Sequence, residues 1–329
     1  MNIDILNQPL TAVDADAVAL LLCEDEAAPP EVNAQWAAEL KVSGEFTGKT
    51  GEMAVAPFPQ GFKAKRLVLI GGGKRAQFDA AALRKAVGSV VRALKSKGVK
   101  KLAWVLAGGD AEAAAEGAVL ANFEPDLHKS KREEKNLENF ILLTADNVRA
   151  AVDRGIVIAE SQNFTRELVN EPGNLLTPGM LADRAKRMAS EAGLECEVLD
   201  QDRMKQLGMG SLLGVAQGSA EPPYLIVVRY KPEGTPKSSD HLGLVGKGVT
   251  FDTGGVSIKP AEGMEKMKYD MAGGAAVLGA MRAIAKLKPS IPVTALVPTV
   301  ENHVGGKAQR PGDIVTSLSG KTIEVLNTD

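Results

Sequence analysis

Four charged side chains share one glycine-rich stretch late in the chain: Lys247, Asp252, Lys259 and Asp270. The first three lie in VGKGVTFDTGGVSIKP and the fourth in the following KMKYDMAGG. Hard divalent cations bind where anionic oxygens converge, and two aspartates joined by tight glycine turns can supply such oxygens. A lysine pressed against a metal ion can lose its proton and act as a nitrogen ligand, while a second lysine stays charged and faces a substrate. The stretch therefore has the composition of a catalytic loop.

Each of these residues also has an ordinary structural explanation. Asp270 could cap a helix, Asp252 could close an Asx-turn, and Lys259 could stand in solvent before Pro260. Their joint position favours a site, because Asp252 follows the apolar run HLGLVGKG and Asp270 opens an apolar helical pattern. Open α/β sheets place binding sites at the carboxyl ends of their strands. We therefore interpret the group as one site.

Signals for other chemistries are weak. The histidines His128, His241 and His303 are scattered and none pairs at ligand spacing, which argues against a histidine zinc site. The sequence has no G-x-S-x-G nucleophile signature. Two runs that resemble phosphate loops, SGEFTGKTG and GGGK, lack the glycine spacing of nucleotide-binding loops and are interpreted as turns.

Length and composition indicate a soluble protein of two domains, because 329 residues with 44% hydrophobic content can bury two cores. With 39 basic and 41 acidic residues, the overall charge requires neither a nucleic acid nor a membrane as partner.

The beginning carries Asp4, Asp14 and Asp16 where a signal peptide would need basic residues, and the apolar run after them is too short to span a bilayer. Cys23 and Cys196 are expected to be buried thiols, and we expect a cytoplasmic protein.

The element pattern is typical of an α/β protein, with short apolar runs alternating with amphipathic helical patterns. The expected strands are AVALLL, RLVLIGGG, KLAWVLAGG, FILLTA, LECEVL, YLIVVRY, HLGLVGKG, PVTALVPTV and the final KTIEVLNTD. The expected helices cover 79–97, 111–120 and 147–168, with one more capped by Thr177 and another opened by Asp270. We expect a smaller N-terminal α/β domain over 1–146, a linking helix over 147–170, and a larger C-terminal α/β domain over 171–329 that carries the charged site.

A DNA-binding role is the competing class of function. Two basic runs could carry it: Arg92, Lys95, Lys97, Lys100 and Lys101, and then Lys129, Lys131 and Arg132. Nearby acids such as Glu133 offset these charges, so a solvated surface is the favoured interpretation. A steep loss of affinity for duplex DNA with rising salt would support the DNA role instead.

The run VGKGVTFDTGGVSIKP, followed by KMKYDMAGG and EVLNTD, closely resembles the cytosolic leucine aminopeptidase family, whose signature is N-T-D-A-E-G-R. The segment NFTRELVNEPGNLLTP also looks like that family's entry into its catalytic domain. The resemblance is highly specific from about Arg166 onwards and weaker before it. It implies that the metal ligands are Lys247, Asp252, Asp270 and Asp329. The residues expected to contact the substrate are Lys247, Asp252, Lys259, Met267 and Asp270.

The resemblance implies a two-metal aminopeptidase that releases N-terminal residues, leucine prominently, from peptides. Lys259 is the expected catalytic lysine, and Met267 matches a position that lines the pocket for the first side chain. Two divalent ions, manganese or zinc, would activate a water molecule, and a bicarbonate held by an arginine would shuttle its proton. The family also implies a homo-hexamer. A catalytically dead structural relative is the remaining alternative, and the intact Lys247, Asp252, Lys259 and Asp270 argue against it.

The sequence stops at Asp329, before the alanine, glutamate, glycine and arginine that complete the signature. By the resemblance, that glutamate bridges the metals and that arginine is catalytic. We therefore expect residues 1–329 to be a fragment that is inactive by itself and binds metal weakly, because a half-built site leaves its like charges poorly neutralised.

Overall fold

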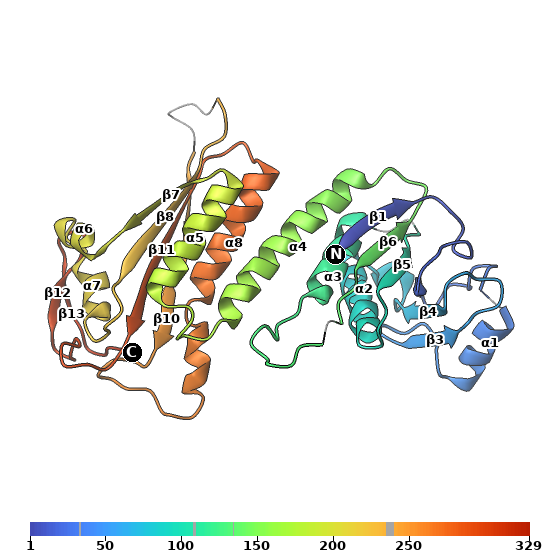
Figure 1. The fold of residues 1–329 in the computed structure, drawn as a ribbon, viewed down its shortest axis with the longest axis horizontal. Coiled ribbons are helices and arrows are strands. Elements are labelled where there is room, and N and C mark those ends of the chain that lie inside the picture. The colour runs from blue at the N-terminus through green and yellow to red at the C-terminus, as the bar shows by residue number, and fades with distance from the viewer. Residues whose placement is uncertain (33, 108–109, 134, 235–239) are drawn as a thin grey trace. The chain divides into compact units, whose positions relative to one another are not determined.

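The computed structural model describes residues 1–32, 34–107, 110–133, 135–234 and 240–329. The chain forms two compact units, Met1–Glu160 and Ser161–Asp329, each with its own sheet (Figure 1). Helix α4 (Arg149–Asn170) contains the division between them. This division falls inside the segment 147–170 that the sequence predicts as the linking helix.

The first unit is built on a six-stranded sheet in the order β1-β6-β5-β2-β4-β3. Its strands are β1 (Asn2–Leu6), β2 (Ala17–Leu22), β3 (Met53–Pro57), β4 (Arg66–Gly71), β5 (Lys101–Val105) and β6 (Asn139–Leu143). All neighbours pair in parallel except β3, which runs antiparallel to β4 at the edge. The expected strands in this half are therefore present.

Helices cover both faces of this sheet. They are α1 (Ala34–Ser43), α2 (Ala80–Lys95) and α3 (Ala111–Asn122), with the short η1 (Arg75–Gln77) before α2. Along β2, Ala17 and Ala19 pack into the core shared with α2 and α3, whereas Val18 and Leu20 pack into the core on the other face. Because successive strand residues point to opposite faces, an apolar run of this kind belongs in the middle of a sheet covered on both sides.

Three lysines of the basic runs lie beside acids: Lys100, Lys101 and Lys129. Lys101 Nζ lies 3.7 Å from Asp14, and Lys100 Nζ lies 3.5 Å from Glu138. These contacts favour the solvated, ion-paired surface over a nucleic-acid interface. Among the described residues, no helix is long and apolar enough to cross a membrane.

The second unit is built on a five-stranded mixed sheet in the order β10-β11-β8-β7, with β9 also pairing with β11. Its strands are β7 (Glu195–Leu199), β8 (Tyr224–Tyr230), β9 (Leu242–Val245), β10 (Gly248–Asp252) and β11 (Val293–Asn302). Strands β9 and β10 run parallel to β11, whereas β8 runs antiparallel to it. A separate hairpin joins β12 (Ile314–Thr316) to β13 (Thr322–Glu324).

Two long helices, α5 (Pro178–Ala192) and α8 (Ala272–Leu287), lie side by side against this sheet (Figure 1). Their apolar sides share one core with β8 and β11. The shorter elements are α6 (Gln201–Gln206), α7 (Gly210–Ala216) and η2 (Met264–Tyr269). Thr177 caps α5 and Pro178 occupies its first turn, as the sequence predicts.

Three expectations about the second unit differ from the structure. The expected strand HLGLVGKG is interrupted, because β9 ends at Val245 and β10 begins at Gly248. Asp270 follows η2, and α8 begins two residues later, so Asp270 does not cap that helix. The last expected strand is only the three-residue β13, and Asp329 lies beyond it in irregular chain.

Candidate metal centre

The break between β9 and β10 positions Lys247. The N–H of Gly246 donates to the carbonyl of Leu296 on β11 (3.0 Å). The next residue of β11 whose backbone N–H would point toward β9 is Pro298. Proline has no N–H to continue the ladder, so the neighbouring strand is free to bend away there. The carbonyl of Lys247 instead accepts a hydrogen bond from Gly274 N–H (2.7 Å) in the first turn of α8. The strand break and the helix start are thus fixed together.

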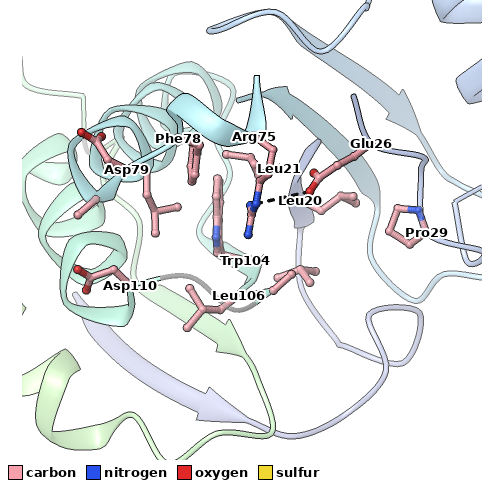
Figure 2. A pocket seen from close by; sticks show the side chains of 14 residues that line it. Leu20, Leu21, Glu26, Pro29, Arg75, Phe78, Asp79, Trp104, Leu106 and Asp110 are labelled. Carbon is pink, nitrogen blue, oxygen red and sulfur yellow. Dashed lines mark ion pairs between the residues drawn. The ribbon is translucent and has the colours of Figure 1, made fainter. Parts of the chain in front are cut away.

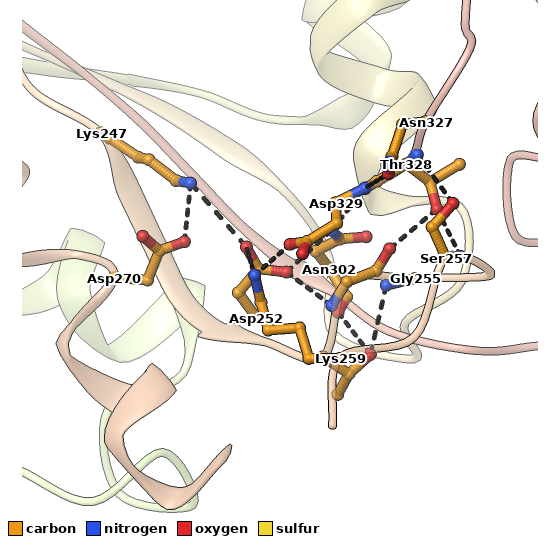
Figure 3. Close-up of polar contacts among 12 residues, drawn as sticks. Lys247, Asp252, Gly255, Ser257, Lys259, Asp270, Asn302, Asn327, Thr328 and Asp329 are labelled. Atoms are coloured by element: carbon orange, nitrogen blue, oxygen red, sulfur yellow. Dashed lines mark hydrogen bonds and ion pairs between the residues drawn. The ribbon is translucent and has the colours of Figure 1, made fainter. Parts of the chain in front are cut away.

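Asp252 is the last residue of β10 and is only 4% exposed. Its Oδ1 accepts hydrogen bonds from the N–H of Gly254 and from Nδ2 of Asn302, both at 2.8 Å. Its Oδ2 lies 3.8 Å from the Nζ atoms of both Lys247 and Lys259 (Figure 3). The two oxygens of this carboxylate therefore have different partners, protein donors for one and cations for the other.

A glycine turn after β10 returns the chain to the site and places Lys259 there. Gly254 and Gly255 have φ values of +88° and +69°, in the left-handed region that favours glycine. A Cβ on Gly254 would also lie 2.4 Å from the carbonyl oxygen of Ser257, so the turn cannot accept a side chain there unchanged. After the turn, Lys259 N–H donates to the carbonyl of Thr253 (2.9 Å).

Asp270 reaches the site from the end of η2. Its Oδ2 lies 2.8 Å from Lys247 Nζ, yet this buried oxygen accepts no aligned hydrogen bond within the described chain. Burial raises the pKa of Asp270, and the nearby Asp252 carboxylate raises it further, against the opposing effect of the Lys247 ammonium. This oxygen is therefore held by the Lys247 ammonium, and it would be able to meet a metal ion if Lys247 bound as a neutral amine.

Asp329 is held in place through its neighbour Thr328. The hydroxyl of Thr328 donates to the carbonyl of Gly254 (2.8 Å) and accepts from the N–H of Ser257 (2.8 Å). The hydroxyl of Ser257 in turn accepts from Thr328 N–H (3.2 Å). These bonds join the segment after β13 to the glycine turn, and they bring the Asp329 carboxylate against Lys259 Nζ (Figure 3).

The five side chains form a row of alternating charge: Asp270, Lys247, Asp252, Lys259 and Asp329. The hydrogen bond to Asp329 raises the pKa of Lys259, with the Asp252 charge acting in the same direction, so this ammonium stays protonated at neutral pH. Over the described ranges, no three His, Cys, Asp or Glu groups gather closely enough to hold a metal by themselves. In this row the ammonium groups stand between the carboxylates.

The donor set nevertheless fits divalent cations. Three carboxylates outnumber two ammonium groups, Asp252 Oδ2 has its two ammonium neighbours only at 3.8 Å, and a neutral Lys247 amine would add a nitrogen ligand. The structure thus brings together Lys247, Asp252, Lys259, Asp270 and Asp329. Met267 lies on η2, partly buried, three residues before Asp270.

Sequence reasoning did not identify Asn302, which contacts Asp252 from the end of β11. A signal was available, because Asn302 is a polar residue at the carboxyl end of an apolar strand, as Asp252 is. The contact itself joins residues fifty positions apart and could not be inferred from local pattern.

A separate cavity of about 290 Å³ lies in the first unit, at the ends of β2 and β5 (Figure 2). Leu20, Leu106 and other apolar residues line it, together with an ion pair between Arg75 and Glu26 (3.6 Å). Asp79 and Asp110 also line it, but their carboxylates accept backbone N–H groups of α2 and α3 as helix caps. Those two acids therefore have a structural explanation, and the cavity lacks the alternating charges of the second unit.

Comparison with known proteins identifies the family of the chain. The family model described as the catalytic domain of the cytosol aminopeptidase family matches residues 163–329, and the model of its N-terminal domain matches 21–132. The probable cytosol aminopeptidase of Solibacter usitatus is 57% identical over 336 residues, covering 100% of this chain and 69% of that protein. The one from Koribacter versatilis is 50% identical over 323 residues, covering 90% and 63% respectively.

Two solved structures are similar along nearly the whole chain. The bottromycin maturation enzyme BotP in complex with Mn superposes with a TM-score of 0.83 at 34% identity, covering 95% of this chain and 66% of that one. A mutant of tomato leucine aminopeptidase gives a TM-score of 0.86 at 31% identity, covering 100% and 68%. The chain thus spans roughly two thirds of the length of the proteins it matches. The two-domain α/β architecture and the family predicted from the motifs are confirmed: this chain belongs to the cytosol aminopeptidase family.

Proposed function

We propose that this chain carries the site of a metal-dependent aminopeptidase that removes N-terminal residues, preferentially leucine, from peptides. The observation that supports this most is the convergence of three aspartates and two lysines from separate segments onto one row. Family membership supports the reaction class, and the Mn-bound relative supports the use of a metal.

Four residues would hold two divalent ions: Lys247, Asp252, Asp270 and Asp329. The chemistry such ions supply when bound is polarisation of the scissile carbonyl and a lowered pKa of the attacking water. Asp252 Oδ2 is the oxygen of that carboxylate available for this, since Oδ1 already accepts two hydrogen bonds. Lys247, which is 57% exposed, would contribute a neutral amine.

Lys259 has a different proposed role. Its raised pKa keeps the ammonium charged, and its side chain is 22% exposed beside Asp252 and Asp329. A charged donor held in this position can stabilise the oxyanion that develops when the peptide carbonyl is attacked. Met267 would line the pocket for the first side chain, and the substrate's free amine would bind beside the aspartates, which restricts cleavage to the N-terminus.

Further features of the family are proposed for this chain on the same basis. The metal would be manganese or zinc, since mixed oxygen and nitrogen ligation does not separate them. A bicarbonate would assist proton transfer, the protein would assemble as a homo-hexamer, and it would work in the cytoplasm. The division into domains at 1–146, 147–170 and 171–329 is likewise part of this proposal.

The experiment that tests the exopeptidase assignment compares leucinamide with N-acetyl-leucinamide as substrates of the full chain, by which we mean the chain continued past Asp329 through the A-E-G-R of the family signature. We expect hydrolysis of the substrate with the free amine alone, because acetylation delocalises the nitrogen lone pair into an amide and leaves no basic amine to bind. Asp252→Asn, which keeps the size of the side chain, should abolish the activity. Equal hydrolysis of the blocked substrate would contradict the proposal.

A further inference from the structure

Asn302 ends β11 directly beside the end of β10. It is 7% exposed, and its register partner in β10 is Asp252. The carbonyl of Asn302 accepts both the N–H and the hydroxyl of Thr253, each at 2.9 Å. The backbone of Asn302 is therefore fixed against the first residue of the glycine turn.

The carboxamide of Asn302 joins two parts of the metal centre. Its Nδ2 donates to Asp252 Oδ1 (2.8 Å) and to the backbone carbonyl of Thr328 (2.9 Å) (Figure 3). Both partners are acceptors only, so the NH₂ group must face them and the amide orientation is determined. The opposite oxygen lies against Gly255, where a Cβ would come within 2.7 Å of it.

These contacts determine which oxygen of Asp252 is available. Oδ1 accepts from Asn302 and from the Gly254 N–H, which satisfies its two lone pairs, and only Oδ2 faces Lys247 and Lys259. The same NH₂ group holds Thr328, and with it the neighbouring Asp329. A leucine at this position would donate nothing, and an aspartate would place a second carboxylate against Oδ1.

We propose that Asn302 is a positioning residue of the metal centre. It turns Asp252 Oδ2 toward Lys247 and Lys259, where the metal ions would bind, and it anchors the Thr328–Asp329 segment. This inference rests on the proposed function, since it concerns residues assigned there as ligands. Partners that orient a ligating carboxylate commonly contribute to metal affinity without touching the metal. A purely structural amide would contribute to folding alone, and the two roles are separable by measurement.

The test measures Mn²⁺ binding to the metal-stripped full chain. Binding is monitored by the loss of the electron paramagnetic resonance signal of free Mn²⁺. We expect Asn302→Ala to raise the Kd by about 10- to 100-fold, the range typical for loss of such a partner. Asn302→Ser keeps a small polar group and is measured beside it, so that the comparison survives if the alanine variant does not fold. The control is Val300→Ala on the same strand, where Val300 is 4% exposed and packs with Val249 and Ala216.

Val300→Ala should lower thermal stability and leave the Kd near the parental value. The inference is overturned if the parent binds Mn²⁺ and the Asn302 variants bind it equally well, or if Val300→Ala weakens binding as much as they do. A parent chain that binds no Mn²⁺ would overturn the proposed metal centre and, with it, this inference. Failure of the proposed function and failure of the Asn302 role are therefore distinguishable.

Discussion

Replacing Lys259 by alanine should separate turnover from metal binding. In the structure its ammonium contacts Asp329 and lies 3.8 Å from Asp252 Oδ2, with 22% of the side chain exposed. The substitution removes a charged donor and leaves all three carboxylates in place. Because Lys259 is followed by Pro260, which favours an extended backbone before it, the main chain at this position should not rearrange.

The expected magnitude follows from the proposed role. An oxyanion-stabilising donor contributes about 3 kcal/mol to lowering the barrier, so Lys259→Ala should reduce kcat by about 100-fold. Lys259→Ala should lower the free energy of unfolding by no more than about 0–1 kcal/mol, since that is the contribution of a partly exposed ion pair. Metal content should remain that of the parent.

The comparison variant is Lys247→Ala, whose ammonium lies 2.8 Å from Asp270 Oδ2. If Lys247 is a ligand, its removal should lower metal occupancy at equilibrium, whereas Lys259→Ala should not. The assay is elemental metal analysis after dialysis, with kcat and KM for leucinamide measured on the same samples. Equal metal loss in the two variants, or full turnover in Lys259→Ala, would refute the assigned roles.

Two further predictions concern the first unit, whose unfolding is followed by tryptophan fluorescence because both tryptophans of the chain, Trp36 and Trp104, lie there. Gly117→Ala should destabilise the unit by about 1–3 kcal/mol, because a Cβ would lie 2.4 Å from a backbone carbonyl of α2; Gly88→Ala, which meets only ordinary contacts, is the control and should not destabilise it. Burial raises the pKa of Asp16, but hydrogen bonds from Lys65 and two backbone N–H groups outweigh it and leave the pKa below its ordinary value of 3.8. Asp16→Asn should therefore cost about 1–3 kcal/mol at neutral pH, and the difference should shrink as pH falls below 3.8 and through the depressed pKa; a pH-independent difference would contradict this.

Local rules were sufficient for much of the fold. The apolar spacing of 79–97 predicts α2, and Asp79 caps it by accepting from Ala82 N–H at 2.8 Å. The run YLIVVRY coincides with β8. In these cases the residues that decide the structure are neighbours in the sequence.

Features that depend on distant residues could not be predicted. The interruption of the strand at Lys247 depends on Pro298, about fifty positions later, and on the start of α8. The sequence indicates Asp252 and Asp270 as candidates from their place after a strand and before a helix, but Asp270 comes from the end of η2 and does not cap α8. Asn302 was missed because its function lies in one contact across the sheet.

The most direct test of the central claim is activity of the full chain after removal of metal. The chain is treated with a chelator, dialysed, and assayed on leucinamide before and after addition of Mn²⁺, with Asp270→Asn as a matched control that keeps side-chain size. The account predicts that stripping abolishes hydrolysis, that Mn²⁺ restores it in the parent, and that restoration is lost or greatly reduced in the variant. Undiminished hydrolysis by the stripped parent would contradict the assignment of this row of aspartates and lysines as a metal centre.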